Sequence, residues 1–78
     1  MSNLEKTREL VAEVLQVPAE RIEPDAALTE IAQLDSLSLV EIASALDEAF
    51  DIRIPSDDLG SARSLNDILA IVERAPPR

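Results

Sequence analysis

Few residues of this chain could do chemistry, and the tripeptide Asp35-Ser36-Leu37 stands out among them. A catalytic serine needs a base beside it to take up the hydroxyl proton, and that base is usually a histidine. The sequence contains no histidine, no cysteine and only one glycine, which excludes thiol catalysis, Cys/His metal sites and glycine-rich phosphate loops. We therefore interpret the Ser36 hydroxyl as an attachment point, and we expect no catalytic residue, no metal site and no enzyme activity.

Asp35 and Ser36 also have a purely structural interpretation. Both residue types are common at helix N-termini, where a side-chain oxygen accepts a hydrogen bond from a backbone N–H. If Asp35 supplies this cap, the Ser36 hydroxyl is left near the positive end of the helix dipole, where a phosphate is stabilised by about 0.3–1 kcal/mol. The two roles are compatible, and the local sequence leaves both open.

Length and charge limit the possible functions further. At 78 residues the chain is one small domain, without room for a cleft that encloses a sizeable substrate. Sixteen acidic and seven basic side chains give a net charge of −9, which opposes contact with nucleic acid or an anionic membrane and favours basic partners.

No apolar stretch approaches the about 20 residues of a membrane span, and the first residues lack the pattern of a secretion signal. We expect a cytoplasmic protein without membrane insertion.

The spacing of apolar residues predicts an all-α fold, a small four-helix bundle of three main helices and one short helix. The main helices are expected over residues 4–17, from about Ser36 to Phe50, and over residues 65–74. The short helix is a single turn at residues 56–59.

A long ordered loop is expected between the first two main helices, over residues 19–34. Ser2 and Glu5 form a candidate capping box for the first helix. We assign residues 1–75 to the domain and residues 76–78 to a flexible tail. The apolar residues expected to anchor the loop are Ile22, Leu28 and Ile31.

The second main helix has one apolar arc, which is expected to face the core. Leu37 and Val40 fall outside this arc, among acidic side chains. Such a surface is either a small docking site for a basic partner or the ordinary solvated face of a helix. The predicted core arc consists of Leu39, Ile42, Ala43, Leu46 and Phe50.

These residues and their order resemble the acyl carrier protein family, whose members are short acidic helical bundles with a phosphopantetheine arm on the serine of an Asp-Ser-Leu motif. A lone Asp-Ser-Leu tripeptide is weak evidence, but its spacing to an acidic helix, a terminal Phe and an Ile-Pro turn is specific. The resemblance covers most of the chain. Its residues are Val17-Pro18, Ile22, Pro24-Asp25-Ala26, Asp35-Ser36-Leu37, Val40-Glu41, Leu46-Asp47-Glu48-Ala49-Phe50 and Ile54-Pro55.

The resemblance implies that a separate phosphopantetheinyl transferase attaches 4′-phosphopantetheine from coenzyme A to Ser36, with Asp35 helping to position this magnesium-dependent transfer. The thiol of the arm would hold an acyl or aminoacyl thioester, supplied by a loading ligase or synthetase and passed to acyl-transferring enzymes with basic docking patches. We expect a monomer without a nucleic-acid partner; the alternative is an unmodified helical interaction domain. The positions that match the family's docking residues are Leu37, Val40, Glu41, Asp47 and Glu48.

Two residues near the motif depart from typical fatty-acid carriers. Gln33 stands where those carriers have a glycine, and Ser38 stands where they have an acidic residue. The segment from residue 33 to residue 37 is more similar to carriers of D-alanine or other amino acids, or to discrete carriers of secondary metabolism. The resemblance therefore points away from a housekeeping role in fatty-acid synthesis.

Overall fold

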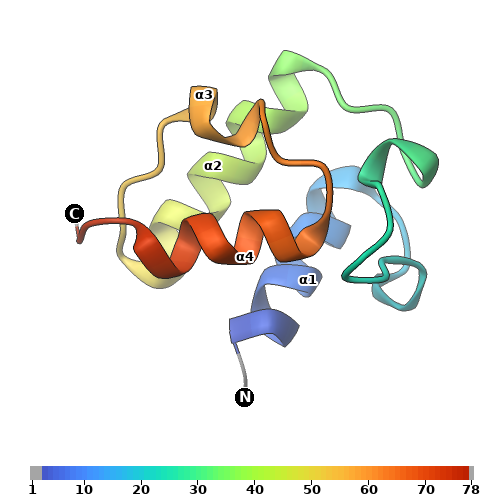
Figure 1. Ribbon diagram of the computed structural model, residues 1–78, viewed down its shortest axis with the longest axis horizontal. Helices are drawn as coiled ribbons and strands as arrows, with labels where there is room; N and C mark the ends of the chain where they lie inside the picture. The colour runs from blue at the N-terminus through green and yellow to red at the C-terminus, as the bar shows by residue number, and fades with distance from the viewer. Residues whose placement is uncertain (1–2, 78) are drawn as a thin grey trace.

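The computed structural model describes residues 3–77, except for the side chain of Ser56, and this part of the chain is helical without a strand. It confirms the predicted small four-helix bundle with a long loop after the first helix (Figure 1). The first helix is two residues shorter at its C-terminal end than predicted, and Ser2 of the candidate capping box lies outside the described residues. The helices are α1 (Asn3–Leu15), α2 (Ser36–Phe50), α3 (Ser56–Leu59) and α4 (Leu65–Arg74), and the loop contains 3-10 turns at Ala19–Arg21 and Leu28–Glu30.

A residue with a left-handed backbone conformation follows each of the first two helices. Gln16 follows α1 with a φ of 59°, and Asp51 follows α2 with a φ of 55°. The next N–H along then reaches back into each helix: Val17 donates to the Ala12 carbonyl and Ile52 to the Asp47 carbonyl, both at 3.1 Å. This is the hydrogen bond of a Schellman motif, and it explains why α1 ends before Pro18 is reached.

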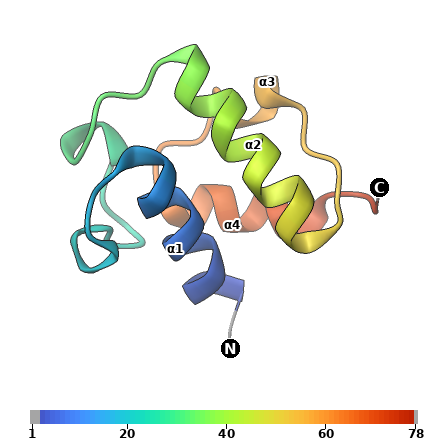
Figure 2. The same ribbon diagram turned by 180° about the vertical axis from the view of Figure 1, so that it is seen from behind.

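The core is aliphatic and lies between the helices. α1 packs against α2 and α4, and α3 packs against α2 and α4. In Figure 1 α4 lies in front of α1 and α2, and in the reverse view of Figure 2 α1 and α2 are nearest the viewer, so α4 covers only one side of this pair. Three residues of the predicted α2 core arc are buried and two, Leu39 and Phe50, are partly buried. The buried apolar residues are Val11, Ala12, Ile22, Leu28, Ile42, Ala43, Leu46, Ile54, Leu59, Leu65, Ile68 and Val72.

Hydrogen bonds tie the long loop to the connection before α4 and to the first turn of α4. The Leu28 N–H donates to the Arg63 carbonyl at 2.8 Å, and the Asn66 side-chain Nδ2 donates to Asp25 Oδ1 at 2.6 Å. These contacts fix the loop that leads the chain into α2. The predicted anchors are Ile22 and Leu28, which are buried, and Ile31, which is partly buried.

Lys6 joins the beginning of α1 to the end of α2, and the two helices run antiparallel (Figure 2). Its Nζ donates to the Ala49 carbonyl at 3.1 Å and lies 4.9 Å from the centroid of the Phe50 ring. A cation is favoured at a helix C-terminus and over an aromatic face. Lys6, the only lysine of the sequence, therefore stabilises the last turn of α2.

The residues after Ala75 lie against the segment that follows α2. The Arg53 N–H donates to the Pro76 carbonyl at 3.0 Å, and Ile52 and Pro77 form an isolated antiparallel bridge. The sequence predicted a flexible tail here, and the structure gives two of its three residues defined partners. The division into residues 1–75 and 76–78 stays a prediction, and Arg78 lies outside the described residues.

Candidate functional site

Ser36 is the first residue of α2, and its side chain is exposed. The N-cap is Asp35, whose Oδ1 accepts a hydrogen bond from the Ser38 N–H at 2.8 Å. Among the described residues none is hydrogen-bonded to the Ser36 hydroxyl. The structure thus separates the two roles that the sequence left open, because Asp35 caps the helix and the Ser36 hydroxyl stays available.

The cap also makes the stability of the fold depend on the ionisation of the Asp35 carboxyl. The hydrogen bond from the Ser38 N–H is the main cause that lowers its pKa below the ordinary value of 3.8. A carboxyl with a lower pKa in the folded state stabilises the fold above its unfolded pKa, and this contribution is lost as the pH falls through the folded pKa.

We expect Asp35→Ala to lower the free energy of unfolding at neutral pH, and the difference from wild type to shrink as the pH falls below 3.8. Urea unfolding at a series of pH values measures this difference. Asp35→Asn is the control, because its amide oxygen keeps a neutral cap that does not titrate in this range. A difference between wild type and Asp35→Ala that stays constant across the series would contradict the assignment.

An exposed apolar surface lies beside Ser36. Leu37 is 65% exposed and Val40 is 49% exposed, and they are the large apolar side chains that stand out as exposed among the described residues. Glu41 and Glu48 are also exposed. We call Leu37, Val40, Glu41 and Glu48 the docking face, after the role that the sequence analysis predicts for these residues; together they form a small exposed apolar surface bordered by negative charge.

Asp47 lies in a different environment from these four residues. It is partly buried, and its Oδ1 accepts a hydrogen bond from the Ile54 N–H at 2.8 Å. Its backbone carbonyl accepts the N–H groups of Asp51 and Ile52. The carboxylate therefore holds the turn that connects α2 to α3, a role that the sequence did not indicate.

Asp47→Ala is expected to lower the free energy of unfolding by about 1–3 kcal/mol, because the N–H of the buried Ile54 loses its acceptor. Asp47→Asn keeps an acceptor oxygen and should lose much less. Urea unfolding of both variants gives the two values. Equal losses in the two variants would show that the charge of Asp47, and not its hydrogen bond, stabilises the fold.

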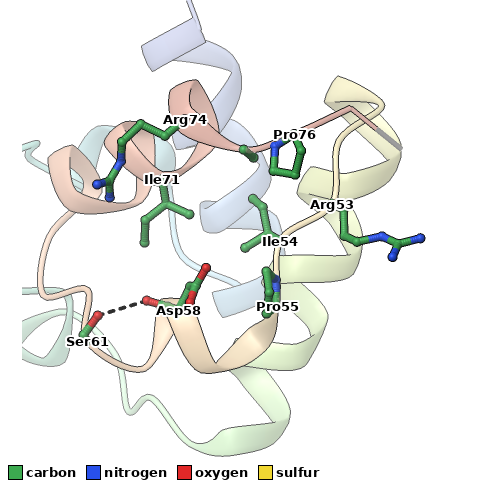
Figure 3. Close-up of a pocket in the computed structure, with 9 residues that line it drawn as sticks. Arg53, Ile54, Pro55, Asp58, Ser61, Ile71, Arg74 and Pro76 are labelled. Carbon is green, nitrogen blue, oxygen red and sulfur yellow. Dashed lines mark hydrogen bonds between the residues drawn. The ribbon is translucent and has the colours of Figure 1, made fainter.

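A pocket of about 520 Å³ lies between α3, α4 and the segment after α2 (Figure 3). The side chains of Ile54 and Ile71 supply its apolar walls, and Arg53 points away from it (Figure 3). The sequence does not predict this pocket, because its residues come from two stretches that are separate along the chain, 53–61 and 71–76. Its lining residues are Arg53, Ile54, Pro55, Asp58, Ser61, Ile71, Arg74, Ala75 and Pro76.

Within residues 3–77 no group of three or more His, Cys, Asp or Glu side chains is placed to hold a metal ion. No helix in the described part of the chain is long and apolar enough to cross a membrane.

Comparison with known proteins decides the family. The protein-family model described as the phosphopantetheine attachment site matches residues 5–72 of this chain. The acyl carrier protein of Helicobacter hepaticus is 33% identical over 73 residues, which cover 94% of this chain and 96% of that protein. This chain belongs to the acyl carrier protein family. The acyl carrier protein of Thermosynechococcus vestitus is 35% identical over 69 residues, which cover 88% of this chain and 85% of that protein. The acyl carrier protein of Thermobifida fusca is 31% identical over 71 residues, which cover 91% of this chain and 90% of that protein.

The prosthetic group of acyl carrier proteins is 4′-phosphopantetheine, and the start of α2 fits it. The Ser36 hydroxyl is exposed at the N-terminus of a helix of 15 residues. A phosphate attached there is stabilised by the helix dipole by about 0.3–1 kcal/mol. The exposed position of Ser36 at the start of α2 therefore agrees with the family assignment. Attachment of the group there requires no change in the surrounding helices.

Proposed function

We propose that Ser36 is the attachment residue, and that the chain carries acyl or aminoacyl groups between enzymes. The observation that carries this proposal is the exposed Ser36 hydroxyl at the start of α2, in a chain that belongs to the acyl carrier protein family. The prosthetic group supplies a thiol that holds the cargo as a thioester, and the sequence has no cysteine of its own. Gln33 and Ser38 favour a cargo other than that of housekeeping fatty-acid carriers.

In the attachment reaction the Ser36 Oγ attacks the pantetheine-side phosphorus of the coenzyme A pyrophosphate. A new P–O bond forms, and adenosine 3′,5′-bisphosphate leaves with the bridging oxygen. The hydroxyl proton passes to a base on the transferase, because the chain has no histidine and Asp35 accepts the Ser38 N–H. The lowered pKa keeps Asp35 ionised beside Ser36, which suits its proposed part in a magnesium-dependent transfer.

Delivery of the cargo needs no catalytic group on the carrier itself. We propose that the docking face contacts basic patches on the transferase, on the loading ligase or synthetase, and on the enzymes that receive the acyl group. The net charge of −9 speeds these encounters, and the small apolar contact keeps the complexes brief. The proposed location is the cytoplasm, where coenzyme A is available.

The test is incubation of the chain with coenzyme A, Mg²⁺ and a broad-specificity phosphopantetheinyl transferase. The intact mass is expected to rise by one phosphopantetheine group, and fragmentation that resolves single residues should place this group on Ser36. An unchanged mass would favour the unmodified interaction domain. Attachment at Ser38 or Ser44 would overturn the assignment of Ser36.

A further inference from the structure

The pocket between α3, α4 and the segment after α2, called here the Ile54–Ile71 pocket, is large enough for a small molecule (Figure 3). Its volume of about 520 Å³ is typical of pockets that hold small ligands. Ile54 is buried and Ile71 is partly buried, and their aliphatic side chains form its walls. The lining includes neither Ser36 nor a residue of the docking face, so the pocket is a separate site.

Three exposed polar side chains stand at the rim of this pocket. They are the guanidinium of Arg74 on α4, the carboxylate of Asp58 on α3 and the hydroxyl of Ser61. In Figure 3 Arg74 lies above Ile71, and Asp58 and Ser61 lie below it, so opposite charges stand on two sides of an apolar surface. Arg53 points away, which leaves Arg74 as the lining cation placed to contact a ligand.

The rim groups keep hydrogen-bonding capacity that the fold does not use. The Arg74 Nε donates to the Ala70 carbonyl at 3.3 Å, and its two terminal nitrogens remain as donors. The Ser61 Oγ donates to the Asp58 carbonyl at 3.0 Å, and its oxygen can still accept. Within the described part of the chain no side chain is paired with the Asp58 carboxylate or with the terminal nitrogens of Arg74. The rim therefore offers donors to an anionic group and acceptors to a cationic one.

The charges select a ligand that carries both signs. The net charge of −9 disfavours a simple anion, and Arg74 at the rim disfavours a simple cation. A zwitterion is neutral overall and pairs with both rim charges, while the apolar walls require that it also has an aliphatic part. A free α-amino acid with an aliphatic side chain combines these three groups in one small molecule.

We propose that the Ile54–Ile71 pocket binds a free aliphatic amino acid such as leucine. The ligand carboxylate accepts hydrogen bonds from the terminal nitrogens of Arg74, and the ligand ammonium donates to the Asp58 carboxylate and the Ser61 oxygen. The aliphatic side chain packs on the two isoleucines. Because the rim is exposed to water, the affinity is expected in the millimolar range. The proposal does not depend on the modification of Ser36.

The test uses the full chain carrying Ser36→Ala, so that the result is independent of the proposed attachment residue. Leucine is titrated while backbone amide resonances are followed by NMR, and saturable shifts are expected around Ile54, Asp58, Ile71 and Arg74. Three matched probes each lack one group: isocaproate lacks the ammonium, leucinamide lacks the carboxylate, and glycine lacks the side chain. Each should bind about tenfold more weakly than leucine.

Two pairs of variants connect the charges of the ligand to the two rim residues. Arg74→Gln is expected to weaken leucine binding about tenfold and to leave leucinamide unaffected, while Asp58→Asn weakens leucine similarly and leaves isocaproate unaffected. Arg63→Gln and Asp57→Asn are the controls, because both residues are exposed and neither lines the pocket. The controls should change leucine binding less than about twofold, and circular dichroism checks that all four variants fold.

Several results would overturn the proposal. Isocaproate or leucinamide that binds as tightly as leucine would show that the pocket does not select a zwitterion. Equal weakening by the variants and their controls would reduce the effect to general charge. Absence of saturable shifts with leucine would remove the site, and it would leave the attachment result on wild type unaffected.

Discussion

The Ser36→Ala variant is expected to keep its unmodified mass after incubation with coenzyme A and the transferase, under conditions that convert wild type completely. The phosphodiester needs an oxygen at position 36, and alanine supplies none. Because the Ser36 side chain is exposed and Asp35 provides the helix cap, the variant should fold as wild type does. Intact-mass spectrometry measures the conversion, and thermal unfolding followed by circular dichroism checks the fold.

Ser38→Ala is the matched control for this experiment. Ser38 lies in the same first turn of α2, and its backbone N–H, which the substitution keeps, donates to Asp35. The control should be converted like wild type. If Ser36→Ala were modified, or if Ser38→Ala alone stayed unmodified, the hydroxyl at position 36 would not be the acceptor.

Leu37→Ala is expected to lower kcat/KM for the transferase about tenfold to a hundredfold with little change in stability. Leu37 is 65% exposed, so it contributes little to the fold, and it follows Ser36 directly. Burial of a leucine side chain in a partner contributes about 1.5–3 kcal/mol, which corresponds to this range of rates. Initial rates at several carrier concentrations give kcat/KM, and urea unfolding gives the stability.

Leu37→Met is the control, because it retains an apolar side chain of similar volume. It should react nearly as fast as wild type. An unchanged kcat/KM in Leu37→Ala would remove Leu37 from the docking face. A large loss of stability in that variant would instead show that Leu37 acts within the fold.

Features that depend on neighbours along the chain could be predicted from the sequence. α2 begins at Ser36 and ends at Phe50 as expected, because the apolar period and the Asp35 cap are local signals. The cap of α4 is equally local: Ser64 Oγ accepts the Asp67 N–H at 3.4 Å, and Asp67 Oδ2 accepts the Arg63 N–H at 2.9 Å. Ser36 could be identified as the candidate attachment residue for the same reason, because its motif consists of three neighbouring residues.

Features that depend on distant segments could not be predicted in this way. Asp47 was predicted to be a docking residue from the resemblance to the family, but its bond to the Ile54 N–H depends on the fold of the turn after α2. The bond between Leu28 and Arg63 joins the long loop to a segment far along the chain. The pocket lined by Ile54 and Ile71 likewise exists only where α4 meets the segment after α2, and periodicity within one helix does not reveal it.

The position of Lys6 bears on the chemical lifetime of the cargo. Thioesters are consumed by amines that are unprotonated and within reach, and Lys6 carries the only side-chain amine of the sequence. Its Nζ is held against the Ala49 carbonyl, 13 residues beyond Ser36 along α2, or about 20 Å of helix. An arm attached to Ser36 can span a distance of this order, so it is the hydrogen bond to the Ala49 carbonyl, and not separation alone, that holds the Lys6 amine away from the acyl group.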